Sequence, residues 1–285
     1  MENLLRKRLK FIKERARVLR EAYAVRRDQL FDDLGPPADL GSAVPGREQH
    51  VANEPFYLVR VEDADISDDA SAIAQRFGGL SGRSVRLEFP RDMFRPPAVY
   101  AIHSGRICLF DIETTGLIPN TYVFLCGFMF YEKGRFVVEQ VLARDYAEEA
   151  GLLHYTRHMM EKYPTWITFN GENFDIPFVK ARMAVTHVNF QPPREHIDLF
   201  GPARKRFHGV LPNHKLATIE RHLRGVGREG DIPGRHIPAA YHRFVRSGDA
   251  RRMKRIVYHN RMDLLAMAIL VNHLAEEQPA TRAVS

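Results

Sequence analysis

An apolar run that contains two carboxylates, residues 108–117, constrains the fold more than any other stretch of this chain. Alternate side chains of an extended strand point to the same face, so Asp111 and Glu113 would lie together on one face of the predicted strand. Two neighbouring acids on a buried strand repel each other unless a cation neutralises them, and carboxylate oxygens suit Mg²⁺ or Mn²⁺. The run therefore favours a metal-binding strand, with an edge strand whose polar face meets water as the alternative.

Two more acids stand where a functional side chain is expected. Asp175 lies near the start of a predicted helix, residues 174–185, which follows a short strand ending at Phe169. Ligand-binding residues often follow the carboxyl ends of strands in α/β sheets. Asp263 lies within a long helical pattern, at the border of its apolar face. A helix cap for Asp175 and a solvated helix face for Asp263 are the alternatives, so the functional interpretation depends on the four acids together.

The four acids occur in three motifs whose order resembles that of the DEDD nucleases, which share a ribonuclease H-like fold. The motifs are Asp-x-Glu-Thr from Asp111, Asn-x-x-x-Phe-Asp ending at Asp175, and His-x-x-x-Asp ending at Asp263. More closely, the chain resembles the YprB-like ribonuclease H-like domain over roughly residues 40–275. The likeness is carried by residues 110–117, 169–171, 174–175, 216–220, 230–234, 237–238, 241 and 259–263.

The resemblance implies an α/β, ribonuclease H-like fold with a mixed five-stranded sheet flanked by helices, and an N-terminal helical extension. The predicted elements are strands at 106–112, 121–131 and 135–143, a helix at 146–163, a strand ending at residue 169 and a helix at 174–185. A turn at residues 132–134 joins the second and third strands as a hairpin. This β-β-β-α-β-α order is the one that the fold requires, and it supports the resemblance independently of the acids.

The resemblance also implies a metal-dependent nuclease, a 3′–5′ exonuclease that hydrolyses phosphodiester bonds of nucleic acid with two Mg²⁺ or Mn²⁺ ions. In such a site the metals lie about 3.5–4 Å apart, and their ligands here would be Asp111, Glu113, Asp175 and Asp263. A non-catalytic nucleic-acid-binding adaptor and a structure-specific endonuclease are the alternatives, since fold does not fix function. The choice between DNA and RNA stays open.

Phosphodiester hydrolysis also requires a general base. One DEDD branch places Tyr four residues before the last Asp and another places His five before it, whereas this chain has His259 at four and Tyr258 at five. We favour His259, because an imidazole pKa near 6.5 suits proton removal close to neutrality. The alternatives are Tyr258 as the base and a structural histidine satisfied by a neighbouring carboxylate.

Six residues are candidates for substrate contacts. Leu117 and Phe174 are the apolar side chains nearest the acids in sequence and could wedge against terminal bases, although core packing accounts equally well for Phe174. Lys215 is a candidate phosphate contact among the basic residues that precede the last motif. The set is completed by three motif residues, Thr114, Asn170 and Asn260.

The charge balance favours a polyanionic partner. The chain has 42 Lys and Arg against 35 Asp and Glu, a net charge of +7 and a pI near 9.5, which promotes nucleic-acid binding through steering and counterion release. Cys108 and Cys126 fall in apolar runs and are predicted to be reduced thiols of a cytoplasmic protein. Because no uninterrupted apolar stretch is long enough, neither a signal peptide nor a membrane span is predicted.

The chain divides into four predicted parts. Residues 1–34 form a basic amphipathic helix, residues 35–104 a linker and accessory segment, residues 105–276 the nuclease domain, and residues 277–285 a disordered tail. The first helix could pack on the body of the protein, support self-association or act as a basic arm. Within the accessory segment, residues 56–61 and 84–89 alternate like strands and residues 69–77 resemble a short helix.

Overall fold

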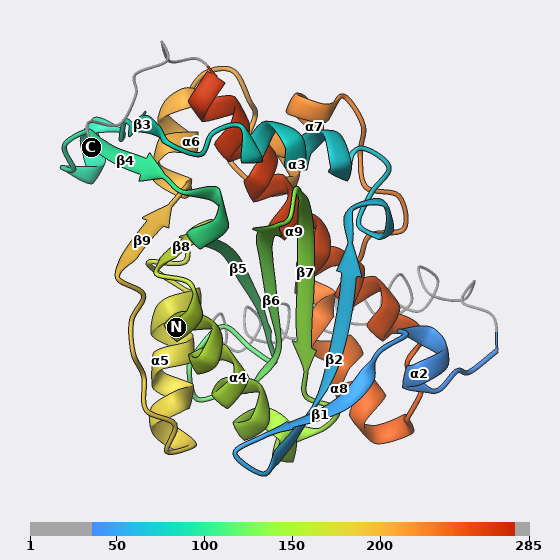
Figure 1. The fold of residues 1–285 in the computed structure, drawn as a ribbon. Coiled ribbons are helices and arrows are strands. Elements are labelled where there is room, and N and C mark those ends of the chain that lie inside the picture. The colour runs from blue at the N-terminus through green and yellow to red at the C-terminus, as the bar shows by residue number, and fades with distance from the viewer. Residues whose placement is uncertain (1–35, 277–285) are drawn as a thin grey trace, which may run out of the picture. The chain divides into compact units, whose positions relative to one another are not determined.

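A mixed sheet of seven strands forms the centre of the protein in a computed structural model that describes residues 36–276 (Figure 1). The strand order is β1 (Arg47–Val51), β2 (Glu54–Glu62), β7 (Arg135–Leu142), β6 (Val123–Glu132), β5 (Ile107–Thr114), β8 (Thr165–Thr168) and β9 (Glu195–Asp198). The predicted amphipathic helix at residues 1–34, with the self-association assigned to it, and the predicted tail at residues 277–285 lie outside the described residues.

The α/β fold is confirmed, but the prediction of a five-stranded sheet is wrong by two strands. β1 and β2 come from the segment expected to be an accessory layer. β2 pairs antiparallel with β7 from Tyr57 opposite Leu142 to Glu62 opposite Val137. Four consecutive side chains of β2 are buried, so this strand belongs to the core and extends the sheet beyond β7.

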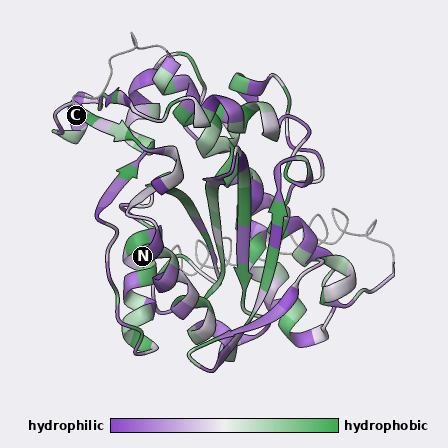
Figure 2. Cartoon of the chain, in the orientation of Figure 1, coloured by the Kyte–Doolittle hydropathy of each residue, from purple (hydrophilic) through white to green (hydrophobic). Residues whose placement is uncertain are grey.

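The strand that carries the first two acids is covered on both faces. β5 is antiparallel to β6 and parallel to β8, and β5, β6 and β7 are predominantly apolar (Figure 2). Strands that lie between two helical layers show such apolar runs in place of strict alternation. α9 (Arg251–Glu276) lies on one face of the sheet, and α4 (Glu149–Lys162) and α5 (Asp175–Val185) lie on the other (Figure 1).

The remaining elements surround these layers. α3 (Ala70–Gly78), α7 (Leu216–Arg224) and α8 (Ile237–Ser247) pack against α9, and so does β3 (Arg83–Leu87), which forms a hairpin with β4 (Ala98–Ile102). The shorter elements are α2 (Leu40–Ala43), α6 (Phe200–Arg206), and the 3₁₀ turns η1 (Asp63–Asp65), η2 (Arg91–Met93), η3 (Ser104–Arg106), η4 (Tyr146–Glu148) and η5 (Gly234–His236). No helix within residues 36–276 is both long and apolar enough to cross a membrane.

Candidate functional site

The first two acids lie on β5 beyond the end of its pairing with β8. That pairing extends only as far as Leu109, so the backbone N–H of Ile112 lies past the last paired residue. It donates to Oδ1 of Asp175, 3.1 Å away, at the start of α5. This hydrogen bond joins the second motif to the strand that carries Asp111 and Glu113.

Asp111, Glu113 and Asp175 each have a raised pKa, and the charge of Asp263 contributes to all three, so the four carboxylates form one electrostatic cluster. Burial is the main cause for Asp111, whose pKa lies well above its usual range, and the charges of Asp263, Asp175 and Glu113 add to the effect. Burial, with the charges of Asp263 and Asp175, likewise raises the pKa of Glu113 well above its usual range. Burial raises the pKa of Asp175 to about 7, although the hydrogen bond from Ile112 opposes it. The cluster is therefore short of positive charge.

Asp263, on α9, is held by a buried arginine from the loop after α7. Nη2 of Arg228 donates to Oδ1 of Asp263 at 2.7 Å, and Nε of the same side chain donates to Oε2 of Glu220 at 2.5 Å. Oδ2 of Asp231 lies 3.6 Å from Nη1 of Arg228. The Arg228 side chain is only 5% exposed, so these carboxylates, and not solvent, balance its charge. The guanidinium thus ties α7, the loop and α9 together beside the acids.

His259 lies between two carboxylates. Its Nδ1 is 2.8 Å from Oδ1 of Asp231, and its Nε2 is 3.5 Å from Oδ2 of Asp263. Burial alone would lower the pKa of His259, but the hydrogen bond to Asp231 and the charges of both carboxylates raise it above its usual value. Tyr258, the alternative base, packs against the hydrophobic core. The spacing of four residues on α9 therefore places His259 beside Asp263, and the fold adds Asp231 on the other side of the ring.

Asn260 is fully buried beside Asp111. Its Nδ2 donates to Oδ2 of Asp111 at 2.8 Å and to the backbone oxygen of the same residue at 3.2 Å. Nε2 of Gln140, on β7, donates to Oδ1 of Asn260 at 2.7 Å. A residue that the sequence placed among the substrate contacts is thus in contact with the first acid.

The apolar candidates and Thr114 lie around the end of β5 and the start of α5. Thr114 is buried beside an irregularity in the pairing of β5 with β6, and its hydroxyl donates to the backbone oxygen of Gly116. Bulges of this kind are frequent next to active sites. Leu117, in the loop that follows, is 85% exposed. Phe174 is half-buried and contacts the ring of Phe178.

Asn170 shapes the loop between β8 and α5. Its backbone is left-handed, with φ 65°, and its N–H donates to Oδ1 of Asp198, whose other oxygen accepts from the N–H of Glu172. Asp198 thereby fixes the turn that leads to Asp175. Lys215 is exposed at the residue that precedes α7.

The roles of three residues of this site were not predicted from the sequence: Gln140, Arg228, which was a candidate phosphate contact, and Asp231. A signal existed for Gln140, because an amide inside an apolar strand needs a buried partner. Gly127 was a second signal, since glycine within a strand often marks the close approach of another group. Arg228 and Asp231 lie in a glycine- and proline-rich stretch whose spacing gives no sign of their partners.

The donor set suits a divalent cation. Carboxylate oxygens are the ligands that Mg²⁺ and Mn²⁺ prefer. After burial, which is the main cause, the charge of Asp263 raises the pKa values of Asp111, Glu113 and Asp175, so the pairing of Asp263 with Arg228 does not cancel its effect on the other acids. In the part of the chain that the structure describes, no three His, Cys, Asp or Glu side chains already converge as a coordination shell. The cluster is defined by the hydrogen bonds from Ile112 to Asp175 and from Asn260 to Asp111, which bring the three motifs together.

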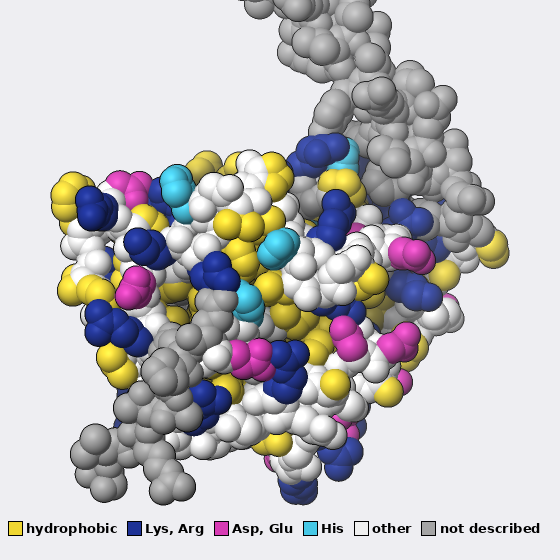
Figure 3. Space-filling model, turned by 90° about the horizontal axis from the view of Figure 1, so that it is seen from above, with side chains coloured by type: hydrophobic (Ala, Val, Ile, Leu, Met, Phe, Trp, Pro, Cys, Tyr) yellow, Lys and Arg dark blue, Asp and Glu magenta, His cyan; other side chains and the backbone are white. Residues whose placement is uncertain are grey.

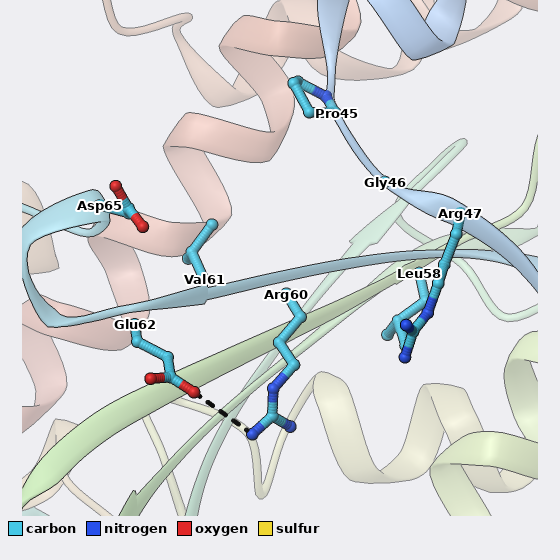
Figure 4. A pocket seen from close by; sticks show the side chains of 8 residues that line it. All are labelled: Pro45, Gly46, Arg47, Leu58, Arg60, Val61, Glu62 and Asp65. Atoms are coloured by element: carbon cyan, nitrogen blue, oxygen red, sulfur yellow. Dashed lines mark ion pairs between the residues drawn. The ribbon is translucent and has the colours of Figure 1, made fainter.

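Two further features of the surface are the face seen from above and a pocket along β2. Seen from above, Lys and Arg side chains are interspersed with acidic and apolar ones (Figure 3). A pocket of about 420 Å³ opens along β2, and Arg60 and Glu62 pair there at 3.6 Å (Figure 4). It is lined by Pro45, Gly46, Arg47, Leu58, Arg60, Val61, Glu62 and Asp65. None of the four acids lines this pocket, so it is separate from the acid cluster.

Comparison with known proteins covers the same region of the chain. Residues 108–275, which include the four acids, match the RNase_H superfamily. The uncharacterized protein YprB of Bacillus subtilis (strain 168) is 30% identical over 181 residues, which are 61% of this chain and 43% of that protein. The match therefore spans less than half of the relative's length. The solved family B DNA polymerase of the hyperthermophilic archaeon Pyrobaculum calidifontis is similar with a TM-score of 0.48 and 11% identity, over 81% of this chain and 45% of that chain.

Proposed function

The chain belongs to the RNase H superfamily, a nuclease-type fold, and on that premise we propose that it is a metal-dependent 3′–5′ exonuclease acting on nucleic acid. The proposed metal ligands are Asp111, Glu113, Asp175 and Asp263. The observation that carries the proposal is that two hydrogen bonds join the three motifs, from the backbone N–H of Ile112 to Asp175 and from Asn260 to Asp111. The raised pKa values of Asp111, Glu113 and Asp175 agree with such a cluster of acids. The net charge of +7 agrees with a polyanionic substrate.

Two bound Mg²⁺ or Mn²⁺ ions would lower the pKa of an attacking water and neutralise charge on the leaving 3′ oxygen. The protein's own part is to hold three of the four carboxylates in a fixed arrangement. The backbone N–H of Ile112 holds Asp175, Arg228 holds Asp263, and Asn260 holds Asp111.

His259 is the proposed general base. A carboxylate accepts hydrogen bonds, so Asp231 favours the ring tautomer with its proton on Nδ1. The lone pair is then on Nε2, the nitrogen that faces Asp263, and a water among the acids could give its proton to that atom. We expect His259→Ala to lower kcat by about 10²–10⁴-fold, whereas Tyr258→Phe should cleave like the wild type.

The substrate strand is proposed to enter beside the loop after β5. Leu117 is exposed there and would wedge against the terminal base, with Phe174 close to the start of α5. The other proposed contacts are Thr114, Asn170 and Lys215.

Degradation of 5′-labelled single-stranded DNA and RNA, with Mg²⁺, Mn²⁺ or EDTA, tests the proposal. We expect products that shorten from the 3′ end, require the metal and disappear in Asp111→Asn. Asp92→Asn is the matched control, because Asp92 is an exposed acid that pairs with Arg204 at 2.8 Å. Cleavage of a circular single strand would indicate an endonuclease, and binding without cleavage would indicate the adaptor function.

A further inference from the structure

A chain of side-chain hydrogen bonds leads from α9 through β7 to Asp111. Nε and Nη2 of Arg261 lie 3.3 and 3.4 Å from Oε1 of Gln140. Nε2 of Gln140 donates to Oδ1 of Asn260, and Nδ2 of Asn260 donates to Oδ2 of Asp111. Gln140 and Asn260 are both 0% exposed. The chain therefore begins at a cation, ends at a carboxylate, and is closed to solvent between them.

Every link points its donor toward Asp111. Nε2 of Gln140 also donates to the backbone oxygen of Val257 at 2.7 Å. This bond fixes the side-chain amide of Gln140 so that its nitrogen faces α9. Asn260 must then present Oδ1 to Gln140 and Nδ2 to Asp111, since a carboxylate only accepts hydrogen bonds. The reversed amide would place its oxygen against Asp111 and leave buried polar groups unsatisfied.

The glycine in the middle of β6 makes room for this amide. Asp111, Gly127 and Gln140 are paired in one row across β5, β6 and β7. A Cβ on Gly127 would lie 2.1 Å from Oδ1 of Asn260, which no pair of non-bonded atoms tolerates. Because glycine weakens the interior of a strand, its presence here has a local reason, namely the space that Asn260 occupies.

We propose that Asn260 is a positioning residue for Asp111, with Gly127 providing the space and Gln140 the orientation of the amide. The inference deepens the proposed function and rests on its metal site, because the outer hydrogen bonds of a metal ligand set its orientation and basicity. Asn260 is itself buried, so it acts on the carboxylate and does not reach the substrate. Loss of the Asn260 side chain should weaken metal binding, lower the turnover rate and leave nucleic-acid binding unchanged.

Four variants test the positioning role: Asn260→Ala, Gly127→Ala, the double variant and Asn272→Ala. The last is the matched control, since Asn272 is another buried asparagine of α9, whose Nδ2 donates to the backbone oxygen of Ile73 on α3. Mn²⁺ affinity is measured by calorimetry, together with kcat, KM and the melting temperature. Asn260→Ala should weaken Mn²⁺ binding and lower kcat by about 10–100-fold with KM unchanged.

Gly127→Ala should reproduce those losses, and the double variant should be no worse than Asn260→Ala. The control should lower only the melting temperature. Additive losses in the double variant would overturn the role of Gly127, and unchanged Mn²⁺ affinity and kcat in Asn260→Ala would overturn the positioning role.

A wild type that binds no Mn²⁺ would contradict the proposed function itself, and thermal unfolding in EDTA then decides the inference. The stability changes caused by Asn260→Ala and Asp111→Ala should be non-additive if the hydrogen bond between the two side chains forms. Additive changes would overturn the inference without reference to metal or activity.

Discussion

At the scale of single residues, the acid cluster destabilises the metal-free protein. Burial and the charges of Asp263 and Asp175 raise the pKa of Glu113, so the folded state binds this proton more tightly than the unfolded state does. Below the ordinary pKa of a glutamate the group has no net effect on stability. As pH rises through that value toward the raised pKa, the folded state loses stability, and the loss is complete above the raised pKa.

Glu113→Gln should therefore raise the melting temperature of the metal-free protein at pH 8. One pKa unit corresponds to about 1.4 kcal/mol, which is about 3–6 °C for a domain of this size. The difference should vanish near pH 4, and it should reverse in saturating Mn²⁺, because the variant lacks a proposed metal ligand. Scanning fluorimetry in EDTA and in Mn²⁺ measures both effects.

Glu172→Gln is the control for that comparison, because Glu172 is an exposed acid that pairs with Arg95. Its melting temperature should show little dependence on Mn²⁺. A Glu113→Gln protein less stable than the wild type at pH 8 in EDTA would contradict the repulsion among the acids.

The residues that the sequence could identify are those with local signals. Asp111 and Glu113 share a strand face, and their spacing alone indicates this. Asp231 and Gln140 were missed because their partners lie 28 and 120 positions away along the chain. Hydrogen bonds at such separations depend on the tertiary fold, which spacing does not reveal.

At the scale of elements, Arg228 joins α7 to α9. Arg228→Met would leave Asp263 without its guanidinium partner, and an unpaired buried charge costs about 3–5 kcal/mol. Glu220 would keep its pair with Arg224, whose Nη1 donates to Oε1 of Glu220 at 2.8 Å. Arg204→Met is the control, because the pair of Arg204 with Asp92 is exposed and worth about 0–1 kcal/mol. Urea unfolding in EDTA measures the free energy of unfolding of both variants. Equal losses in the two variants would show that Arg228 contributes no more than a surface ion pair.

The loop after β5 carries the next prediction. Leu117→Ala should leave the free energy of unfolding within about 0.5 kcal/mol of the wild type, since the side chain is 85% exposed. Binding of a single-stranded 3′ end should weaken about fivefold, as expected if burying the leucine contributes about 1 kcal/mol. Val185→Ala, at the far end of α5 and 60% exposed, should bind normally. Unchanged affinity and processivity in Leu117→Ala would contradict the proposed role of Leu117 as a wedge against the terminal base.

The elements from β5 to α5 could be predicted because each is a long apolar run or a clear helical pattern. α8 was not, because its first residues lie in a stretch, 225–241, whose glycines and prolines are typical of a loop. The strand at residues 56–61 was predicted, but its place beside β7 was not, because strand pairing is a property of the fold and not of either strand alone.

At the scale of the whole described molecule, the accessory segment completes the core. β2 covers the edge of β7, and α3 packs against α9. Phe77 of α3 is 0% exposed and lies 5.3 Å from the ring of Phe136 on β7. The family match begins at residue 108, whereas the sheet begins at residue 47. The region that matches the superfamily is therefore smaller than the region that forms the sheet.

A chain of residues 105–276, the nuclease domain predicted from the sequence, should consequently fail to fold as a monomer. Without the accessory segment, β7 would expose a row of unpaired N–H and C=O groups, and α9 would expose the apolar face that α3 covers. We expect residues 36–276 to melt in one cooperative transition and residues 105–276 to aggregate or to melt without one. Circular dichroism and size-exclusion chromatography distinguish these outcomes. A monomeric, cooperatively folded chain of residues 105–276 with metal-dependent cleavage would instead show that β1, β2 and α3 are dispensable, and that the nuclease fold is complete with five strands.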